Sequence, residues 1–203
     1  MNPKPMLSLF VFATCIAHGQ GTFVYDQQSS DENSPAESVA GIQANQPIGQ
    51  SFTPALSSIG FIRLQLFDLN PGNGLGASVY VNLRTSSITG PIIGSTDLVF
   101  LPDGFFAPNV VGFTNFFFSV PVSVAPNSTY YFQPVVQSGD VIILGRLIPG
   151  SDYAGGTEFI QGQPGFDDVW FREGIVVPEP SAALLGLLGA GLVALAWRRR
   201  KVL

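Results

Sequence analysis

The residues best suited to chemistry are acids in the C-terminal third of the chain: Asp152, Glu158, Asp167, Asp168 and Glu173. Two carboxylates held close together with different pKa values could hydrolyse a glycosidic bond. A cluster of carboxylate oxygens could instead hold calcium. Nothing in the spacing pairs two of these acids, and the adjacent Asp167 and Asp168 would point to opposite faces of a strand. We therefore expect no catalytic residues, no cofactor and no enzyme activity. A calcium site stays the alternative if Asp167 and Asp168 lie in a loop.

The segment 68–74, with the sequence Asp-Leu-Asn-Pro-Gly-Asn-Gly, superficially matches a calcium-binding loop. The register fails, because its sixth position is Asn73 instead of glycine and its twelfth is Val79 instead of glutamate. We expect a hairpin turn here and no metal site.

Aromatic residues of the same C-terminal third could bind a sugar. The candidate contacts are Tyr153, Trp170 and Phe171, and the same glycine-rich region contains Phe159 and Phe166 beside hydrogen-bonding glutamine and aspartate side chains. Flat aromatic faces with polar neighbours are typical of glycan sites. Because strand residues alternate, one of Trp170 and Phe171 should face solvent. The alternative is that both belong to the core of a last strand.

The end of the chain has three parts in a fixed order. Val177, Pro178, Glu179 and Pro180 come first, followed by the apolar segment 181–197 and then by a basic tail. The tail, which should act as a stop-transfer signal, consists of Arg198, Arg199, Arg200 and Lys201. Seventeen helical residues reach about 25 Å, the short end of what crosses a bilayer. Clustered basic residues beside a span stay on the cytoplasmic side, so the preceding chain should face outward.

This arrangement resembles the PEP-CTERM sorting signal of Gram-negative bacteria. Pro178, Glu179 and Pro180 match its motif, 181–197 its span and 198–201 its basic tail. The resemblance implies export, transient membrane residence and processing by the membrane protease exosortase, commonly in organisms that build an extracellular polysaccharide. An ordinary C-terminal anchor is the alternative. Two prolines one residue apart resist helix and should keep the motif extended.

The N-terminus has the pattern of a secretory signal peptide. Lys4 precedes the apolar run 6–16, and the small residues Ala17 and Gly19 follow it. We expect signal peptidase to remove residues 1–19 and to leave Gln20 as the first residue. The cut removes the single cysteine, Cys15, and the single histidine, His18. The mature protein then has no disulfide, no zinc ligands of these types and no histidine base.

Charge and composition indicate what kind of protein the expected exported segment 20–177 is. Only Glu179 of the chain's 14 acidic residues lies outside it and only four of the nine basic residues lie inside it, which leaves a net charge of −9. Such a surface repels nucleic acid. Charged residues are 11% of the chain, and it contains 23 glycines and 16 prolines, a composition typical of an extracellular β protein with many turns.

Alternating hydrophobicity predicts strands. Ile62, Leu64 and Leu66 alternate with polar residues, as do Val79, Val81 and Leu83. Further candidates are 49–53, 96–101, 115–122, 129–136, 141–147 and 169–173, and 27–36 reads as a mobile loop. No amphipathic helix lies between these strands, so we expect an all-β fold: a β-sandwich or jelly-roll ectodomain over 20–177, between the signal peptide 1–19 and the sorting signal 178–203 with its single transmembrane helix.

Several stretches of the ectodomain resemble the choice-of-anchor β-sandwich domains of bacterial surface proteins. They are 50–53, 61–67, 71–76 with the following 79–81, and 124–132. This resemblance carries no general biochemical activity. The sequence thus predicts an exported protein of the cell envelope or extracellular matrix, with signal peptidase, exosortase and the membrane as partners. We expect a structural or adhesive ectodomain, with a carbohydrate-binding module or carbohydrate-active enzyme as the alternative. Extracellular polysaccharide is then its candidate ligand.

Overall fold

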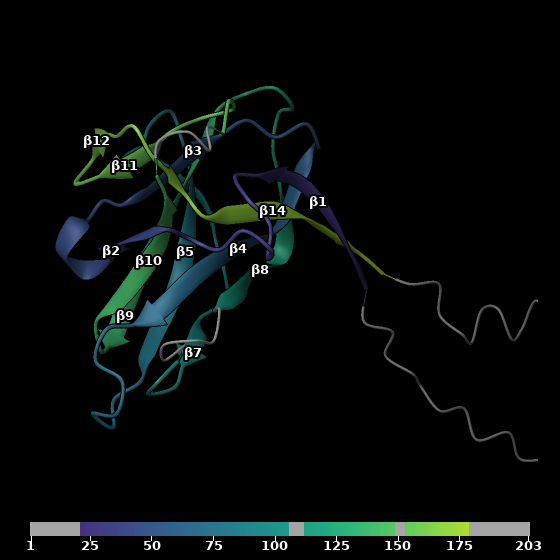
Figure 1. Cartoon of the computed structure of the whole chain (residues 1–203). Helices are drawn as coiled ribbons and strands as arrows, with labels where there is room; N and C mark the ends of the chain where they lie inside the picture. Colours follow the sequence, from purple (N-terminus) through teal and green to yellow (C-terminus); the bar gives the residue numbers. More distant parts are fainter. Residues whose placement is uncertain (1–20, 106–111, 149–152, 179–203) are drawn as a thin grey trace, which may run out of the picture. The chain divides into compact units, whose positions relative to one another are not determined.

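The computed structural model describes residues 21–105, 112–148 and 153–178, and its compact part is Phe23–Val176 (Figure 1). The strands are β1 Thr22–Gln28, β2 Ser38–Gly41, β3 Gly49–Phe52, β4 Ser58–Asp68, β5 Ala77–Thr85, β6 Ile92–Ser95, β7 Val99–Leu101, β8 Phe113–Ser123, β9 Tyr130–Gly139, β10 Ile142–Leu147, β11 Glu158–Ile160, β12 Gln163–Pro164, β13 Asp168–Val169 and β14 Phe171–Val177. A short 3-10 helix, Gln43–Asn45, connects β2 to β3.

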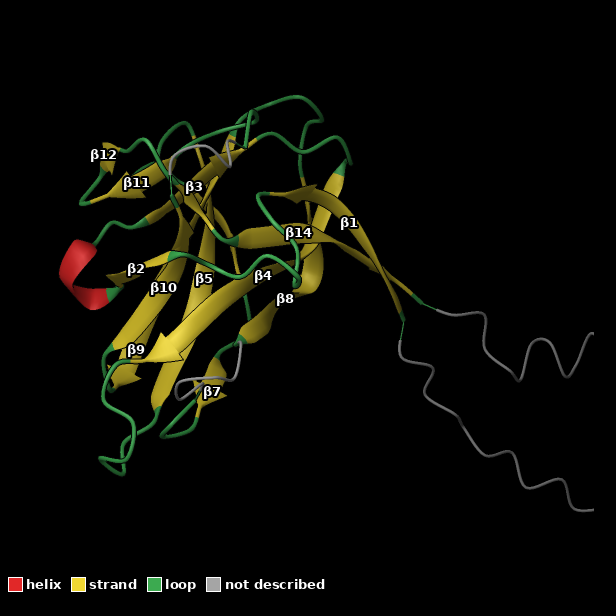
Figure 2. Ribbon diagram, in the orientation of Figure 1, coloured by secondary structure: helices red, strands yellow, loops and turns green. Residues whose placement is uncertain are grey.

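The strands form two seven-stranded sheets (Figure 2). The first has the order β1-β14-β4-β10-β13, with β2 beside β10 and β8 beside β4. The second has the order β12-β11-β3-β9-β5-β6, with β7 beside β5. The central pairs β4–β8, β4–β14 and β5–β9 are antiparallel. The expected all-β sandwich is confirmed, whereas the signal peptide 1–19 and the segment 181–197 lie outside the described residues.

Alternation was a reliable guide to the central strands. Ile62, Leu64 and Leu66 of β4 are fully buried, and Arg63 between them is only partly so. In β5 the side chains of Val79, Val81 and Leu83 are likewise buried.

The sequence does not predict the strands β1, β2 and β6, because these segments show no clean alternation of apolar and polar residues. The expected loop 27–36 is wrong at its start, where Gln27 and Gln28 end β1.

The rest of that loop is fastened to the outer face of the first sheet. Glu32 forms ion pairs with Arg63 of β4 and Arg172 of β14. The Arg172 guanidinium also lies 3.3 Å from the centre of the Tyr25 ring. Ser29 adds two hydrogen bonds to β14: its hydroxyl accepts from the Phe171 amide, and its own amide donates to the Phe171 carbonyl. We call residues 29–37 the strap.

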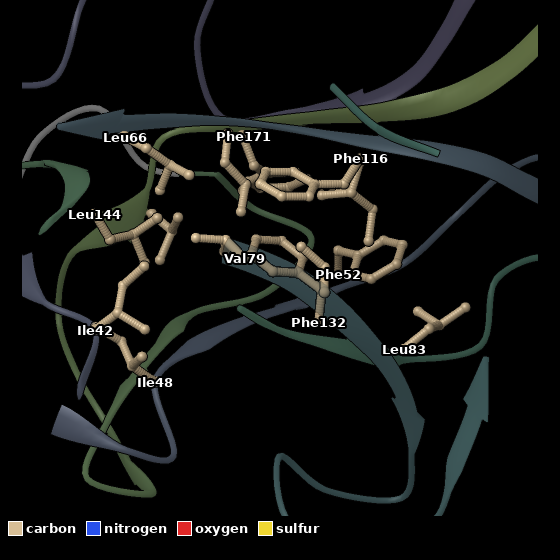
Figure 3. Packing of buried hydrophobic residues seen from close by; sticks show 14 of the residues in the cluster. Ile42, Ile48, Phe52, Leu66, Val79, Leu83, Phe116, Phe132, Leu144 and Phe171 are labelled. Atoms are coloured by element: carbon tan, nitrogen blue, oxygen red, sulfur yellow. The ribbon is translucent and has the colours of Figure 1, made fainter. Parts of the chain in front are cut away.

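Phenylalanine rings from both sheets meet in the core (Figure 3). Phe171 of β14 lies 5.2 Å from Phe132 of β9 and 6.1 Å from Phe52 of β3, measured between ring centres. All three side chains are fully buried. Burying one such side chain contributes about 1.5–3 kcal/mol. Phe171 therefore holds the last strand of the first sheet against two strands of the second.

One carboxylate of the described residues, that of Glu173, is buried beside this core with no cation to neutralise its charge. Glu173 lies two residues after Phe171 on the same face of β14, opposite Ile62 of β4, and it is fully buried. Neither of its oxygens accepts a hydrogen bond of normal geometry. Burial, together with the charge of Asp26 nearby, raises the pKa of Glu173 to about 8, although the Gln27 amide lowers it slightly.

This raised pKa predicts that stability depends on pH. Below the ordinary pKa of 4.5 Glu173 is protonated in both states and costs nothing. As pH rises toward 8 the unfolded chain releases the proton and the folded chain retains it, so stability should fall by up to about 1.4 kcal/mol per pH unit. Glu173→Gln should remove this loss between about pH 5 and 8.

The measurement is chemical denaturation of segment 20–177 at several pH values. The control is Glu37→Gln, which changes an exposed glutamate of the strap. An equal pH dependence in the two variants would show that Glu173 is not the group responsible.

Candidate functional site

The predicted sorting residues follow the last strand of the sandwich directly. Val177 is the final residue of β14 and is 43% exposed, and Pro178 after it is exposed and ends the described chain. Glu179, Pro180 and the basic tail 198–201 lie outside the described residues. In the part of the chain that the structure describes, no helix is long and apolar enough to cross a membrane.

The structure corrects the predicted exposure of the aromatic site. Trp170 and Phe171 are both fully buried, so the expectation that one of them faces solvent is wrong. The two side chains do point to opposite faces of the sheet. The outward face is covered, because the Trp170 ring packs 4.2 Å from that of Phe113 and its Nε1 donates to the Ser34 carbonyl of the strap.

Tyr153, the third predicted sugar contact, also serves the fold. Its ring packs edge-on against Phe171 at 5.2 Å. Its hydroxyl donates to Gln27 Oε1 at 2.8 Å and accepts from the Thr53 amide at 3.3 Å. Burial is the main cause that raises the pKa of Tyr153 to about 12. The phenol therefore stays protonated and links β1 to the end of β3.

The acids of this region are also committed to internal contacts. Arg146 of β10 pairs with Glu158 at 2.6 Å and with Asp167 at 2.7 Å, and the hydrogen bond with Glu158 raises the pKa of Arg146. Asp168 accepts from Gln50 Nε2 and from the Tyr153 amide. Asp152 lies outside the described residues. The carboxylates thus join β10, β11 and β3 across the two sheets.

The turn after β4, residues 69–76, is likewise held by hydrogen bonds to carboxylates, those of Asp103 and Asp140. Asp103 accepts from the amides of Gly72 and Gly74, and these bonds lower its pKa. Asp140 accepts from the Val141 amide, the largest cause of its lowered pKa, and from the side chains of Asn70 and Asn73. Donor groups therefore occupy the oxygens that a cation would need.

A different aromatic pair remains accessible on the outer face of the second sheet. Tyr131 of β9 and Phe159 of β11 meet edge to face at 5.6 Å, and both are partly exposed. Beside them the Arg84 Nε donates to Gln133 Oε1, and the Gln133 amide donates to Gln46 Oε1. Phe159 belongs to the aromatic region that the sequence points to, but Tyr131 and the polar side chains beside it come from distant segments that a local pattern does not bring together.

The buried position of Trp170 predicts a structural effect of its loss. Trp170→Ala should destabilise the sandwich by about 3–5 kcal/mol, because it removes ring packing and leaves a cavity under the strap. Phe166→Ala is the control, since Phe166 is 94% exposed, and its effect should stay within about 0.5 kcal/mol. Both values come from denaturant unfolding. Equal stability of the two variants would contradict the packing described here.

Comparison with known proteins identifies the C-terminal segment. Residues 176–201 match the PEP-CTERM protein-sorting motif. No curated protein matches the chain. The resemblance of the sandwich to choice-of-anchor domains stays a prediction. The matched residues contain the Pro-Glu-Pro sequence, the apolar segment and the basic tail in the expected order. The chain therefore joins a β-sandwich domain to a C-terminal PEP-CTERM motif, which implies export, processing by exosortase and sorting to the cell surface.

Proposed function

We propose that the chain is the precursor of a structural or adhesive protein of the cell envelope or extracellular matrix. Signal peptidase removes residues 1–19, segment 181–197 holds the exported domain at the membrane, and exosortase then acts at the Pro-Glu-Pro sequence. The mature product in this proposal is the β-sandwich itself.

The junction between fold and motif carries the proposal. The matched segment begins at residue 176, and β14 ends at Val177. Before that point β14 already pairs with β4 and lies between β4 and β1. A cut after Val177 therefore removes no residue of the sandwich. A domain that is complete before the cut can survive release from its anchor, as a displayed protein requires.

The contacts of the acids favour a role without catalysis. Glu158 and Asp167 are tied to Arg146, and Asp168 is tied to Gln50 and the Tyr153 amide. Glu173 is fully buried. Glycoside hydrolysis needs two carboxyl groups that reach the substrate, and these four do not offer such a pair.

Carbohydrate binding is the second candidate, supported by the pair Tyr131 and Phe159. An aromatic pair beside a row of hydrogen-bonding side chains suits a sugar ring with its hydroxyl groups. The buried Gln133 orders the partly exposed Arg84 and Gln46 through hydrogen bonds, which lowers the entropy cost of binding. The net charge of −9 over 20–177 favours a neutral polysaccharide over a polyanion.

Processing tests the main proposal. Pro180→Ala should leave an unprocessed, membrane-retained precursor in the native host, because it removes the constraint that keeps the motif extended. The parent should yield a soluble product that begins at Gln20 and ends near Pro180, as read by intact mass and cell fractionation. Pro126→Ala, an exposed proline between β8 and β9, is the control. Normal maturation of the Pro180 variant would contradict the proposal and would show that segment 181–197 is an ordinary membrane anchor.

Retention on the matrix polymer tests the second candidate. Phe159→Ala should lower the retention of segment 20–177 on matrix polysaccharide, by about 0.5–1.5 kcal/mol of binding free energy if the ring stacks on sugar. Phe100→Ala removes a 67% exposed ring from the edge strand β7 and should leave retention unchanged. If the parent itself is not retained, the structural role stands alone.

A further inference from the structure

The two ends of the sandwich differ in charge. One end, which we call the exit end, comprises residues 23–24, 53–58, 85–92, 120–130 and 175–176. None of these residues is Asp, Glu, Lys or Arg. The loops at the opposite end carry three aspartates, Asp68, Asp103 and Asp140.

Strand pairing gathers the exit end from distant segments. Tyr130 is paired with both Phe52 and Thr85, and Ser58 is paired with Ser123. Two hydrogen bonds join the loops: the Val124 amide donates to the Ser57 carbonyl and the Asn127 amide to the Pro54 carbonyl.

The last strand leaves the sandwich at this same end. A Cβ on Gly60 would lie 3.5 Å from the Val176 amide nitrogen, so β14 finishes beside the start of β4. The first strand lies alongside: Gly174 approaches the Val24 carbonyl so closely that any side chain there would collide with it. β1 and β14 are neighbours in the first sheet (Figure 1).

Three charged side chains lie at or beside the exit end. The Asp97 carboxylate accepts from the hydroxyl of Ser119, the residue before Val120, at 2.6 Å. The Asp26 carboxylate accepts from the amides of Ala55 and Leu56 at 2.8 Å. The Arg84 guanidinium donates to the Gly90 carbonyl. An arginine at this place is compatible with an anionic surface.

Apolar side chains also reach solvent at the exit end. Val120 is 75% exposed, Ile92 is 50% exposed and Val24 is 39% exposed. Around them the loops offer Ser, Thr, Asn and Pro. Contact with a lipid interface desolvates few polar groups of such a surface, whereas it would remove charged side chains from water at a large cost.

The chain beyond β14 limits how far this surface can lie from a membrane. Five residue steps separate Val176 from Ser181, the first residue of the apolar segment, and they span at most about 18 Å when extended. The polar headgroup layer occupies about 6 Å of that distance. A span of only 17 residues is short for a bilayer and draws its flanks inward.

The geometry points to a lipid contact: while the precursor is anchored, the exit end of the sandwich rests on the outward leaflet of the membrane through Val120, Ile92 and Val24. This inference rests on the proposed anchoring by segment 181–197. The end whose loops carry no charged residue of their own then faces lipid headgroups, and the end with the three aspartates faces away from them.

Site-specific fluorescence tests the contact. The full chain, with its single cysteine replaced (Cys15→Ser), is labelled with an environment-sensitive dye at Val120→Cys, Phe100→Cys or Leu188→Cys. Phe100 is 67% exposed and lies on β7, whose Leu101 pairs with Ala77 beside the aspartate loops. Leu188 lies within the apolar segment. Each protein is reconstituted into vesicles of phosphatidylethanolamine and phosphatidylglycerol that contain a spin-labelled lipid as quencher.

The inference expects strong quenching at 188, clear quenching and a blue shift at 120, and neither effect at 100. Quenching at 188 with equal, weak signals at 120 and 100 would overturn the lipid contact and leave the anchor intact. No quenching at 188 would overturn the anchoring and the contact with it. A signal at 120 that follows the protein density in the vesicle instead of the quencher would assign this surface to a second copy of the chain and would also overturn the lipid contact.

Discussion

The packing of β14 in the first sheet is the constraint on which the rest of this protein depends. Phe171 places this strand against Phe52 and Phe132 of the opposite sheet, and backbone pairing joins it to β4. Without a cysteine in the exported segment, no disulfide can replace these contacts. The match to the sorting motif begins at residue 176 and β14 ends at Val177, so the strand and the motif overlap by two residues. The Pro-Glu-Pro sequence itself starts only after the last strand residue.

The strap and the ion pairs both hold together segments that are distant in the sequence. Glu32 joins the arginines of β4 and β14 on the outer face of the first sheet, and Arg146 joins Glu158 to Asp167 between the sheets. Partly buried pairs of this kind stabilise less than apolar packing, but they fix which segments lie together. Among the described residues, Glu32, Arg63, Arg172, Arg146, Glu158 and Asp167 all take part in such pairs.

The uneven distribution of charge gives the sandwich a direction. Three aspartates, Asp68, Asp103 and Asp140, lie at the loops of one end, whereas the loops at the end from which β14 leaves carry no charged residue of their own and bind the Asp26 side chain of β1. In the lipid contact proposed above, the aspartate loops would face the exterior. The partly exposed pair Tyr131 and Phe159 lies on the outer face of the second sheet, so it would remain accessible before and after release.

The sequence by itself determined the sorting signal, the all-β class and the central strands, because these depend on local order: motif, apolar run, basic tail and period-two alternation. It did not determine whether Trp170 is exposed. Alternation correctly sends Trp170 and Phe171 to opposite faces, but only the tertiary structure brings Ser34 and Phe113 over the outward face. The sequence also did not determine which basic residue pairs with Glu158, because Glu158 and Arg146 belong to opposite sheets. Local pattern specifies the direction of a side chain, whereas the segment that covers it is decided by contacts between residues far apart in the chain.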